Sequence, residues 1–253
     1  MGLFTGKKGL VFGVANDRSI AWAMSDALYA EGAELAFTHL PGERSGRRVH
    51  QLVDPKGAKI VLSCDVQKDE ELFAAVKDQM GTIDFCIHSV AFAPTDELKT
   101  TYSESTRAGW HMAMDISAYS IVAIARRAAA IMPNGGSIVA LTYFGGEKVI
   151  PGYNLMGVCK AALEHSVRYL AFDLGRKKVR VNALSAGPMR TLASAGIPNI
   201  DEMHDYQAQK SPLGRKVEFE ELGKAGLYLL SDMSSAVTGE THHVDCGYNV
   251  MGI

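Results

Sequence analysis

The chain has 253 residues, 47% of them hydrophobic, and a formal net charge of −2. This length suits one large α/β domain whose core needs neither a disulfide nor a metal, and the near-neutral charge argues against a nucleic-acid partner held by bulk electrostatics. No apolar run approaches the ~20 residues of a membrane span, and the first residues pass straight into a strand pattern, so we expect neither a membrane segment nor a signal peptide.

Strand and helix patterns alternate along the chain, because short apolar runs predict strands and the amphipathic runs between them predict helices. The expected strands cover residues 8–13, 33–38, 58–64, 83–88, 137–142, 179–184 and 241–244. The expected helices cover residues 19–31, 44–53, 68–80, 107–132, 153–174 and 218–231, with a long irregular segment before the last one.

Near-continuous apolar strands joined by helices indicate a parallel sheet that is covered on both faces. The sequence therefore predicts a doubly wound α/β fold of the Rossmann type, with three αβα layers, and residues 1–253 as a single domain. The connection over residues 193–211 is long enough to act as a lid over a ligand, with Met203 and Tyr206 facing it. A pair of surface helices is the alternative interpretation of this segment.

The four cysteines lie far apart inside apolar runs, and no Cys-x-x-Cys or paired histidine spacing accompanies them. We therefore expect no metal site and interpret the thiols as buried and reduced. Reduced thiols predict a reducing compartment, the cytoplasm. The histidines carry no motif and are interpreted as structural.

The turn after the first expected strand has properties that suit a dinucleotide. Gly13 permits a sharp turn, Ser19 offers a hydroxyl, and the helix that follows offers free N–H groups to a pyrophosphate. The turn lacks the Gly-x-Gly-x-x-Gly pattern, so a small-residue turn without a ligand is also open.

The end of the second expected strand decides between the two nicotinamide dinucleotides. A carboxylate there would bind the ribose 2′-hydroxyl, but the strand ends in His39-Leu40. Arg44, Arg47 and Arg48 follow within two turns, either as partners of a 2′-phosphate or as a solvated helix face. At this point both NADH and NADPH remain open.

Tyr153 and Lys160 lie seven residues apart in an expected helix. Each residue turns a helix by about 100°, so seven steps end roughly 20° from the starting direction and the two side chains share one face. Such a pair suits an electrophilic site, because the phenol can donate to a developing oxyanion and the ammonium favours the phenolate-like form.

Four segments together resemble the bacterial NAD-dependent enoyl-acyl-carrier-protein reductases of the short-chain dehydrogenase/reductase superfamily. They are Gly13-x5-Ser19-Ile20-Ala21, the run from His88 to Pro94, Tyr143-x9-Tyr153-x6-Lys160, and the run from Ser185 to Ala193. The resemblance extends from Gly6 to Asp245. Ordinary carbonyl reductases of the superfamily carry the lysine four positions after the tyrosine, where this chain has Gly157.

The resemblance implies reduction of the carbon–carbon double bond of a trans-2-enoyl-acyl-carrier-protein thioester by NADH, the last reductive step of type II fatty-acid elongation, in a homotetramer. Tyr153 would bond the thioester carbonyl, Lys160 would bond the nicotinamide ribose, and Tyr143 would be a second catalytic-site tyrosine. The implied cofactor contacts are Gly13, Ser19, Ile20, Leu40, Asp65, Val66, Val90, Met189, Arg190, Thr191, Leu192 and Ala193, and Ala93 would line the substrate pocket.

The chain departs from the family pattern at a few positions. Leu40 stands where relatives have Gln or a basic residue, and an apolar side chain there favours NADH without excluding NADPH. Ala91, Met114 and Cys246 also differ, which leaves the pocket shape and subunit packing open. Two other functions remain as alternatives: a carbonyl reductase of the same superfamily, and a dinucleotide sensor without catalysis.

Overall fold

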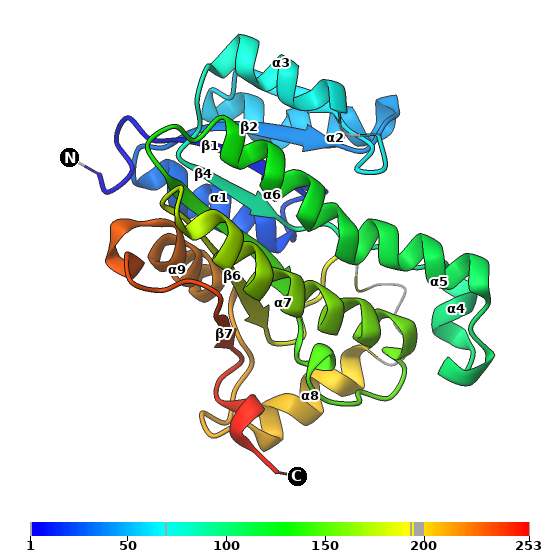
Figure 1. Ribbon diagram of the computed structural model, residues 1–253. Coiled ribbons are helices and arrows are strands. Elements are labelled where there is room, and N and C mark those ends of the chain that lie inside the picture. Colours follow the sequence, from blue (N-terminus) through cyan, green and yellow to red (C-terminus); the bar gives the residue numbers. More distant parts are fainter. Residues whose placement is uncertain (1, 69, 193, 195–199, 253) are drawn as a thin grey trace.

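The computed structural model describes residues 2–68, 70–192, 194 and 200–252. Within them, one seven-stranded parallel sheet has the order β3-β2-β1-β4-β5-β6-β7 (Figure 1). The strands are β1 (Lys8–Phe12), β2 (Glu34–His39), β3 (Ile60–Ser63), β4 (Phe85–His88), β5 (Gly136–Thr142), β6 (Val179–Ala186) and β7 (Thr241–Val244). The predicted doubly wound sheet is confirmed.

Helices cover both faces of this sheet, as the three layers of Figure 1 show. The helices are α1 (Ile20–Ala30), α2 (Glu43–Val53), α3 (Glu70–Met80), α4 (Thr95–Lys99), α5 (Arg107–Met114), α6 (Ser120–Ala130), α7 (Asn154–Gly175), α8 (Ile200–Lys210) and α9 (Phe219–Leu230). No helix in the described residues is both long and apolar enough to cross a membrane.

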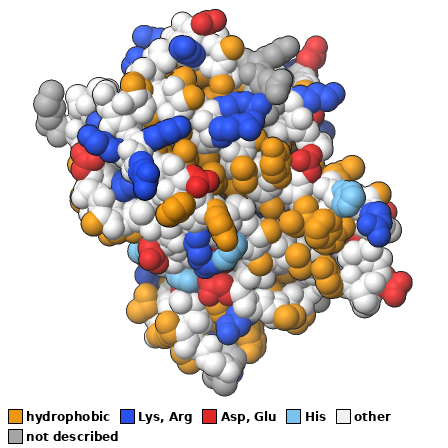
Figure 2. Space-filling view, in the orientation of Figure 1, with side chains coloured by type: hydrophobic (Ala, Val, Ile, Leu, Met, Phe, Trp, Pro, Cys, Tyr) orange, Lys and Arg blue, Asp and Glu red, His pale blue; other side chains and the backbone are white. Residues whose placement is uncertain are grey.

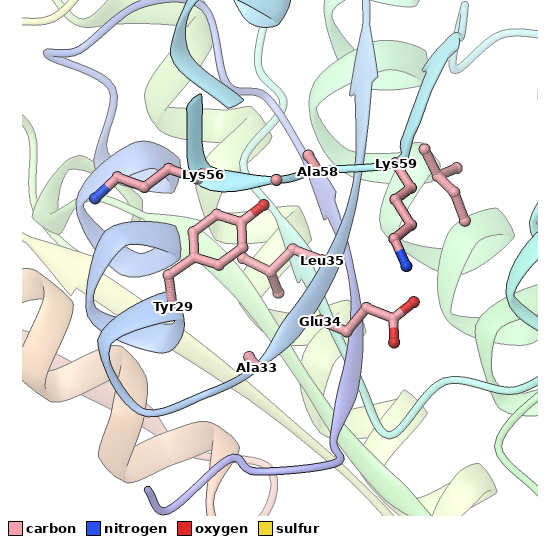
Figure 3. Close-up of a pocket in the computed structure, with 9 residues that line it drawn as sticks. Tyr29, Ala33, Glu34, Leu35, Lys56, Ala58 and Lys59 are labelled. Carbon is pink, nitrogen blue, oxygen red and sulfur yellow. The ribbon is translucent and has the colours of Figure 1, made fainter. Parts of the chain in front are cut away.

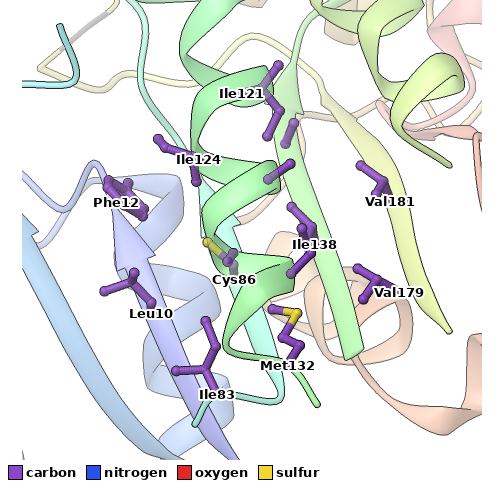
Figure 4. Close-up of a cluster of buried hydrophobic side chains, with 14 of the residues drawn as sticks. Leu10, Phe12, Ile83, Cys86, Ile121, Ile124, Met132, Ile138, Val179 and Val181 are labelled. Carbon is purple, nitrogen blue, oxygen red and sulfur yellow. The ribbon is translucent and has the colours of Figure 1, made fainter. Parts of the chain in front are cut away.

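Alternate residues of each strand feed two separate cores, because successive side chains point to opposite faces of a sheet. On one face, Leu10 and Ile138 pack with Ile121 and Ile124 of α6 and with apolar residues of α3 and α7 (Figure 4). On the other face, α1, α2 and α9 pack over a second buried cluster. The strands are therefore apolar on both sides, which is what their uninterrupted apolar runs predicted.

Three elements differ from the expectation. The expected helix over residues 107–132 contains one π-helical turn, Asp115–Tyr119, between α5 and α6. A short helix, α4, precedes it where none was expected. The segment expected to be irregular before the last helix contains α8, whose sequence has too few apolar residues for a helical stripe to be recognised.

Candidate active site

The carboxyl ends of β1 and β4 lie side by side where the strand order reverses direction, and ligands bind at this point in doubly wound folds. Gly13 follows β1 with a φ of 94°. A Cβ at this position would lie 1.9 Å from the carbonyl oxygen of Ser89, which follows β4. The sharp turn expected at Gly13 is therefore present, and only glycine fits it.

Ser19 shapes the loop between Gly13 and α1. Its hydroxyl oxygen accepts hydrogen bonds from the N–H groups of Ala15 (2.9 Å) and Asn16 (3.0 Å), and the hydroxyl donates to the Asn16 carbonyl oxygen at 2.8 Å. In this structure the hydroxyl is thus used within the loop. The N–H groups of Trp22 and Ala23 donate to the Ser19 carbonyl oxygen, so at the start of α1 those of Ile20 and Ala21 lack intrahelical partners, at the same end of the sheet as Gly13.

Leu40, Asp65 and Val66 lie at the neighbouring carboxyl ends of β2 and β3. The Cys64 N–H donates to the His39 carbonyl oxygen at 2.8 Å, which holds these two strand ends together. Leu40 is 68% exposed, and Asp65 and Val66 are half-buried. The structure therefore brings the three residues predicted to contact adenosine to one edge, with no Lys or Arg at the tip of β2.

A cavity of about 520 Å³ adjoins this edge and is lined in part by His39, Glu43, Arg47 and His50. Arg47 pairs with Glu43 at 3.7 Å, and both side chains are largely exposed. This geometry fits the interpretation of the arginines as a solvated helix face. They also lie on α2, the helix that directly follows β2, which is where partners of a 2′-phosphate would lie.

A second cavity, of about 210 Å³, lies at the opposite, amino-terminal ends of β2 and β3 (Figure 3). Tyr29, Glu34, Lys56 and Lys59 are among the residues that line it. The Tyr29 hydroxyl is buried there without a hydrogen-bond partner. Gly13 lies at the carboxyl ends of the strands, so this cavity at their amino-terminal ends is not part of the crevice.

Tyr143 and Tyr153 meet edge to face. Tyr143 follows β5 in extended conformation, and Tyr153 directly precedes α7. Their ring centroids are 4.9 Å apart, with an interplanar angle of 75°. A turn of 3-10 helix, Phe144–Gly146, follows Tyr143 and packs against Tyr153. A Cβ at Gly145 would lie 2.4 Å from the Tyr153 ring.

Lys160 lies on α7, seven residues after Tyr153, and is 6% exposed. Its ammonium donates to the Leu141 carbonyl oxygen at 2.8 Å, so it is held against the end of β5. Asn154, the first residue of α7, has a φ of 39°, so the backbone from Tyr153 to Lys160 is not a regular helix throughout and the seven-residue interval alone does not place the two side chains on one face. The structure thus brings both tyrosines and the lysine to the carboxyl end of β5.

Burial sets the protonation states of these side chains. Burial raises the pKa of Tyr153 well above its usual value, and Tyr143, Cys159 and Glu164 raise it further. Burial likewise raises the pKa of Tyr143. It lowers the pKa of Lys160 to about 8, against the opposing effects of Cys159 and Glu164. The expectation of a phenolate-like Tyr153 is therefore wrong for this structure, because desolvation disfavours the charged phenolate.

Ala93 is 8% exposed and belongs to the same apolar cluster as Tyr153, with Tyr143 packed against it. The rest of this cluster comprises Leu98, Ala113, Leu155, Met156, Cys159, Trp110, Met114 and Ile150. Val90 is half-buried on the loop between β4 and Ala93. An apolar wall next to a phenol suits a substrate with a hydrocarbon part.

The run after β6 forms a compact turn beside α8. Met189 is buried, and its carbonyl oxygen accepts a hydrogen bond from the Ser194 hydroxyl at 2.7 Å. The Thr191 N–H donates to the same hydroxyl oxygen, and Arg190 pairs with Asp201 of α8 at 2.6 Å. Leu192 is 50% exposed. Ala193, which was also predicted to contact the cofactor, lies outside the described residues.

The described part of the expected lid is mainly α8. Its buried side includes His204 and Gln207, and the Gln207 amide donates to the Asp245 carbonyl oxygen at 3.1 Å. Met203 is half-buried, and Tyr206 is 47% exposed. These two side chains are thus available on the outer part of α8, as either a lid or a surface helix would have them.

Several residues that shape the site have no sequence motif. Ser117, in the π-helical turn, bonds both backbone groups of Phe92 at 2.8 Å and so fixes the loop that carries Val90 and Ala93. Thr142 donates to the buried carboxyl of Glu164 at 2.6 Å. The i,i+4 spacing of Lys160 and Glu164 was the available signal. Among the described residues, no group of three or more His, Cys, Asp or Glu is placed to hold a metal ion.

Comparisons with known proteins identify the family. The family model for enoyl-(acyl carrier protein) reductase matches residues 13–249. The chain is 49% identical to the enoyl-[acyl-carrier-protein] reductase [NADH] 1 of Rhizobium meliloti, over 100% of this chain and 93% of that protein. It is 48% identical to the corresponding NADH enzyme of Rickettsia conorii, over 99% of this chain and 97% of that protein.

Solved structures give the same result. The enoyl-acyl-carrier-protein reductase of Anaplasma phagocytophilum, in complex with NAD, matches with a TM-score of 0.95 and 48% identity, over 100% of this chain and 97% of that one. The Bacillus cereus enzyme, solved with NADP⁺ and an indole naphthyridinone, matches with a TM-score of 0.96 and 46% identity over the full length of both chains. By sequence, fold and family model alike, the chain belongs to the enoyl-acyl-carrier-protein reductase family, within the short-chain dehydrogenase/reductase superfamily.

Proposed function

We propose that this protein reduces the carbon–carbon double bond of trans-2-enoyl-acyl-carrier-protein thioesters with NADH, the last reductive step of bacterial type II fatty-acid elongation. The observation that carries the proposal is the buried, protonated phenol of Tyr153, which lies against Tyr143 at the end of β5 that also holds Lys160. Curated relatives with up to 49% identity are named as NADH-dependent enzymes of this activity.

The crevice fits a dinucleotide, because Gly13 allows the turn after β1 to lie close against Ser89 and the N-terminus of α1 has N–H groups for a pyrophosphate. When bound, NADH supplies the hydride that reaches the β-carbon of the substrate. Exposed, uncharged Leu40 at the ribose end favours NADH over NADPH. The residues proposed to hold the cofactor are Gly13, Ser19, Ile20, Leu40, Asp65, Val66, Val90, Lys160, Met189, Arg190, Thr191, Leu192 and Ala193.

Tyr153 acts on the thioester oxygen, where negative charge develops as the substrate becomes an enolate. Because its pKa is raised, the phenol keeps its proton and donates a hydrogen bond to that oxygen. Lys160 binds the nicotinamide ribose, and Tyr143 closes the outer wall of the pocket. The α-carbon then takes a proton, either from Tyr153 or from a water that Lys160 orders.

The acyl chain enters along the wall that includes Ala93, and the carrier protein presents it. Residues 193–211, with α8, act as the lid of a single catalytic domain, with Met203 and Tyr206 towards the chain. Buried thiols at Cys64, Cys86 and Cys159 support a location in the reducing cytoplasm.

The protein forms a homotetramer through its long helices. The outer face of α7 carries Tyr169 (65% exposed) and Phe172 (81% exposed) one turn apart. Figure 2 shows hydrophobic side chains over α7 on this side of the molecule, with charged side chains among them. Large exposed aromatic side chains at helical spacing support an interface there.

The test is an assay of NADH oxidation with crotonyl and acetoacetyl thioesters, and with enoyl chains of increasing length. The wild-type protein turns over the enoyl substrates, and Tyr153→Phe lowers kcat/KM by ~10²–10³, the usual loss for one oxyanion donor. Tyr29→Phe is the matched control, because its hydroxyl is buried without a partner at the opposite edge of the sheet. Its activity stays at the wild-type level.

Two outcomes would replace the proposal. Turnover of only the oxo substrate would make the protein a carbonyl reductase. This is disfavoured by Gly157, where a lysine could not fit because a Cβ would lie 2.8 Å from the Gly145 carbonyl oxygen. NADH binding without oxidation in the presence of any enoyl thioester would make it a dinucleotide sensor.

A further inference from the structure

Two adjacent hydrogen bonds fasten α7 to the end of β5. The Lys160 ammonium donates to the Leu141 carbonyl oxygen at 2.8 Å, and the Thr142 hydroxyl donates to a carboxyl oxygen of Glu164 at 2.6 Å. Lys160 and Glu164 are four residues apart, so they lie on one side of α7. Their partners are consecutive in β5, and Tyr143 is the next residue. The two bonds therefore fix the backbone from which Tyr143 starts.

The Glu164 carboxyl group is buried. It is 3% exposed, and a Cβ on Gly146 would lie 2.7 Å from its Oε1 atom, so the turn after Tyr143 lies directly on it. A buried ionisable group without a structural need is costly, and such groups concentrate at functional sites. Glu164 is close enough to Lys160 for the two charges to interact.

Other titratable groups lie near Lys160 and Glu164, on α7 itself and on the neighbouring elements. Glu147, on the loop after the 144–146 turn, lies near Glu164, but its carboxylate is already bonded to His243 of β7 at 2.7 Å. Arg168 faces Glu164 from the next turn of α7. His88 of β4 and Cys159 lie near Lys160. Burial and the Lys160 charge lower the pKa of His88 to about 3, so this imidazole is neutral and does not compete with the ammonium.

Burial and the neighbouring groups have opposite effects on the pKa of Lys160. Burial lowers its pKa to about 8, while Cys159 and Glu164 raise it. The Cys159 thiol has its own pKa raised to about 11, mainly by burial, so it is uncharged near neutral pH. Burial also raises the pKa of Glu164, and the hydrogen bond from Thr142 opposes that shift. Glu164, in its ionised form, is therefore the remaining negative charge that acts on Lys160.

We propose that Glu164 is a positioning residue: its buried carboxyl group anchors Thr142 beneath Tyr143 and places a negative charge one turn along α7 from Lys160. The inference rests on the proposed function only in assigning Lys160 to the nicotinamide ribose. It predicts that loss of the charge and loss of the hydrogen bond have different consequences.

The experiment compares wild type, Glu164→Gln and Thr142→Val in NADH binding, followed by fluorescence, and in kcat/KM, both from pH 6 to 9.5. Glutamine keeps an oxygen for Thr142 but removes the charge, whereas valine removes the hydrogen bond and keeps the charge. In wild type, binding weakens as pH rises through about 8. In Glu164→Gln, the pH at which binding weakens is about one unit lower than in wild type. Binding at pH 8 is then roughly fivefold weaker than in wild type, and binding at pH 6 is equal.

Thr142→Val lowers kcat at every pH, because the turn that carries Tyr143 loosens. It displaces the pH dependence of binding less than Glu164→Gln does, because the Glu164 carboxyl group stays in place. Glu164→Asp keeps the charge, so NADH binding weakens at the same pH as in wild type. Unchanged circular dichroism shows that each variant is folded. A Glu164→Gln profile that superimposes on wild type overturns the inference, as does an equal displacement in Thr142→Val. NADH binding reports on Glu164 even if no enoyl thioester is reduced, so failure of the proposed function is seen separately, in the wild-type assay.

Discussion

At Tyr153 and Lys160 the same physical cause has opposite effects on charge. Removal from water favours the neutral form of each group, so the phenol keeps its proton while the ammonium becomes easier to lose. The seven-residue interval predicted from regular helix geometry that the two side chains share a face, but Asn154 departs from that geometry with a φ of 39°. The interval could not predict the direction of the tyrosine pKa shift, because burial depends on residues such as Ala93 and Leu98 that are distant in sequence.

Cys246 is strained by its backbone. It follows β7 with a φ of 59°, in the left-handed region that side chains with a Cβ disfavour. Cys246→Gly is expected to stabilise the protein by about 1 kcal/mol, because relief of this strain exceeds the added entropy of an unfolded glycine. Urea unfolding measures the change. Cys246→Ala keeps the Cβ and should gain nothing; an equal gain in both variants would assign the effect to the thiol instead.

The elements that the sequence missed are those whose stability comes from polar contacts. α8 buries His204 and Gln207, so its buried side has no apolar stripe to reveal it. The π-helical turn Asp115–Tyr119 inserts into a regular helical pattern without a sequence signature. Hydrogen bonds between Ser117 and Phe92 and between Ser120 and His88 accompany it. The strands were predictable because their apolar runs are uninterrupted.

The contact between α7 and the 144–146 turn depends on glycine at both surfaces. A Cβ at Gly157 would lie 2.8 Å from the Gly145 carbonyl oxygen, so Gly157→Ala pushes the turn away from α7. We expect kcat/KM to fall at least ~10-fold, because Tyr143 and Tyr153 lose their edge-to-face register and small misplacements in a site are costly. Steady-state assays with an enoyl thioester measure this loss.

Gly175→Ala is the matched control for this contact. Gly175 is the last residue of the same helix, and a Cβ there meets no atom within 4 Å. Its activity should equal that of wild type, since alanine only strengthens the end of α7. If Gly157→Ala retained full activity, the close approach of the turn would not matter for the register of the two tyrosines.

Among the described residues, the outer face of α7 carries large aromatic side chains that the rest of the chain leaves uncovered. The two cores account for the apolar residues between sheet and helices, yet Tyr169 and Phe172 point away from both. An aromatic side chain that is 81% exposed gains little from the fold of one chain. Burial against the same face of a second copy would give it a stabilising role, and a shared face of this kind forms a two-fold interface.

Phe172→Lys tests the proposed tetramer. A charge at the centre of an apolar interface is costly to bury, so the variant should dissociate into smaller species, while wild type has the mass of four 27.3-kDa chains. Light scattering after size exclusion measures the mass. Met233→Lys is the control, because Met233 is 59% exposed on the turn after α9, at the other face of the sheet from α7. A monomeric wild type, or a tetramer that survives Phe172→Lys, would show that α7 does not form the interface and that the exposed aromatics serve another contact.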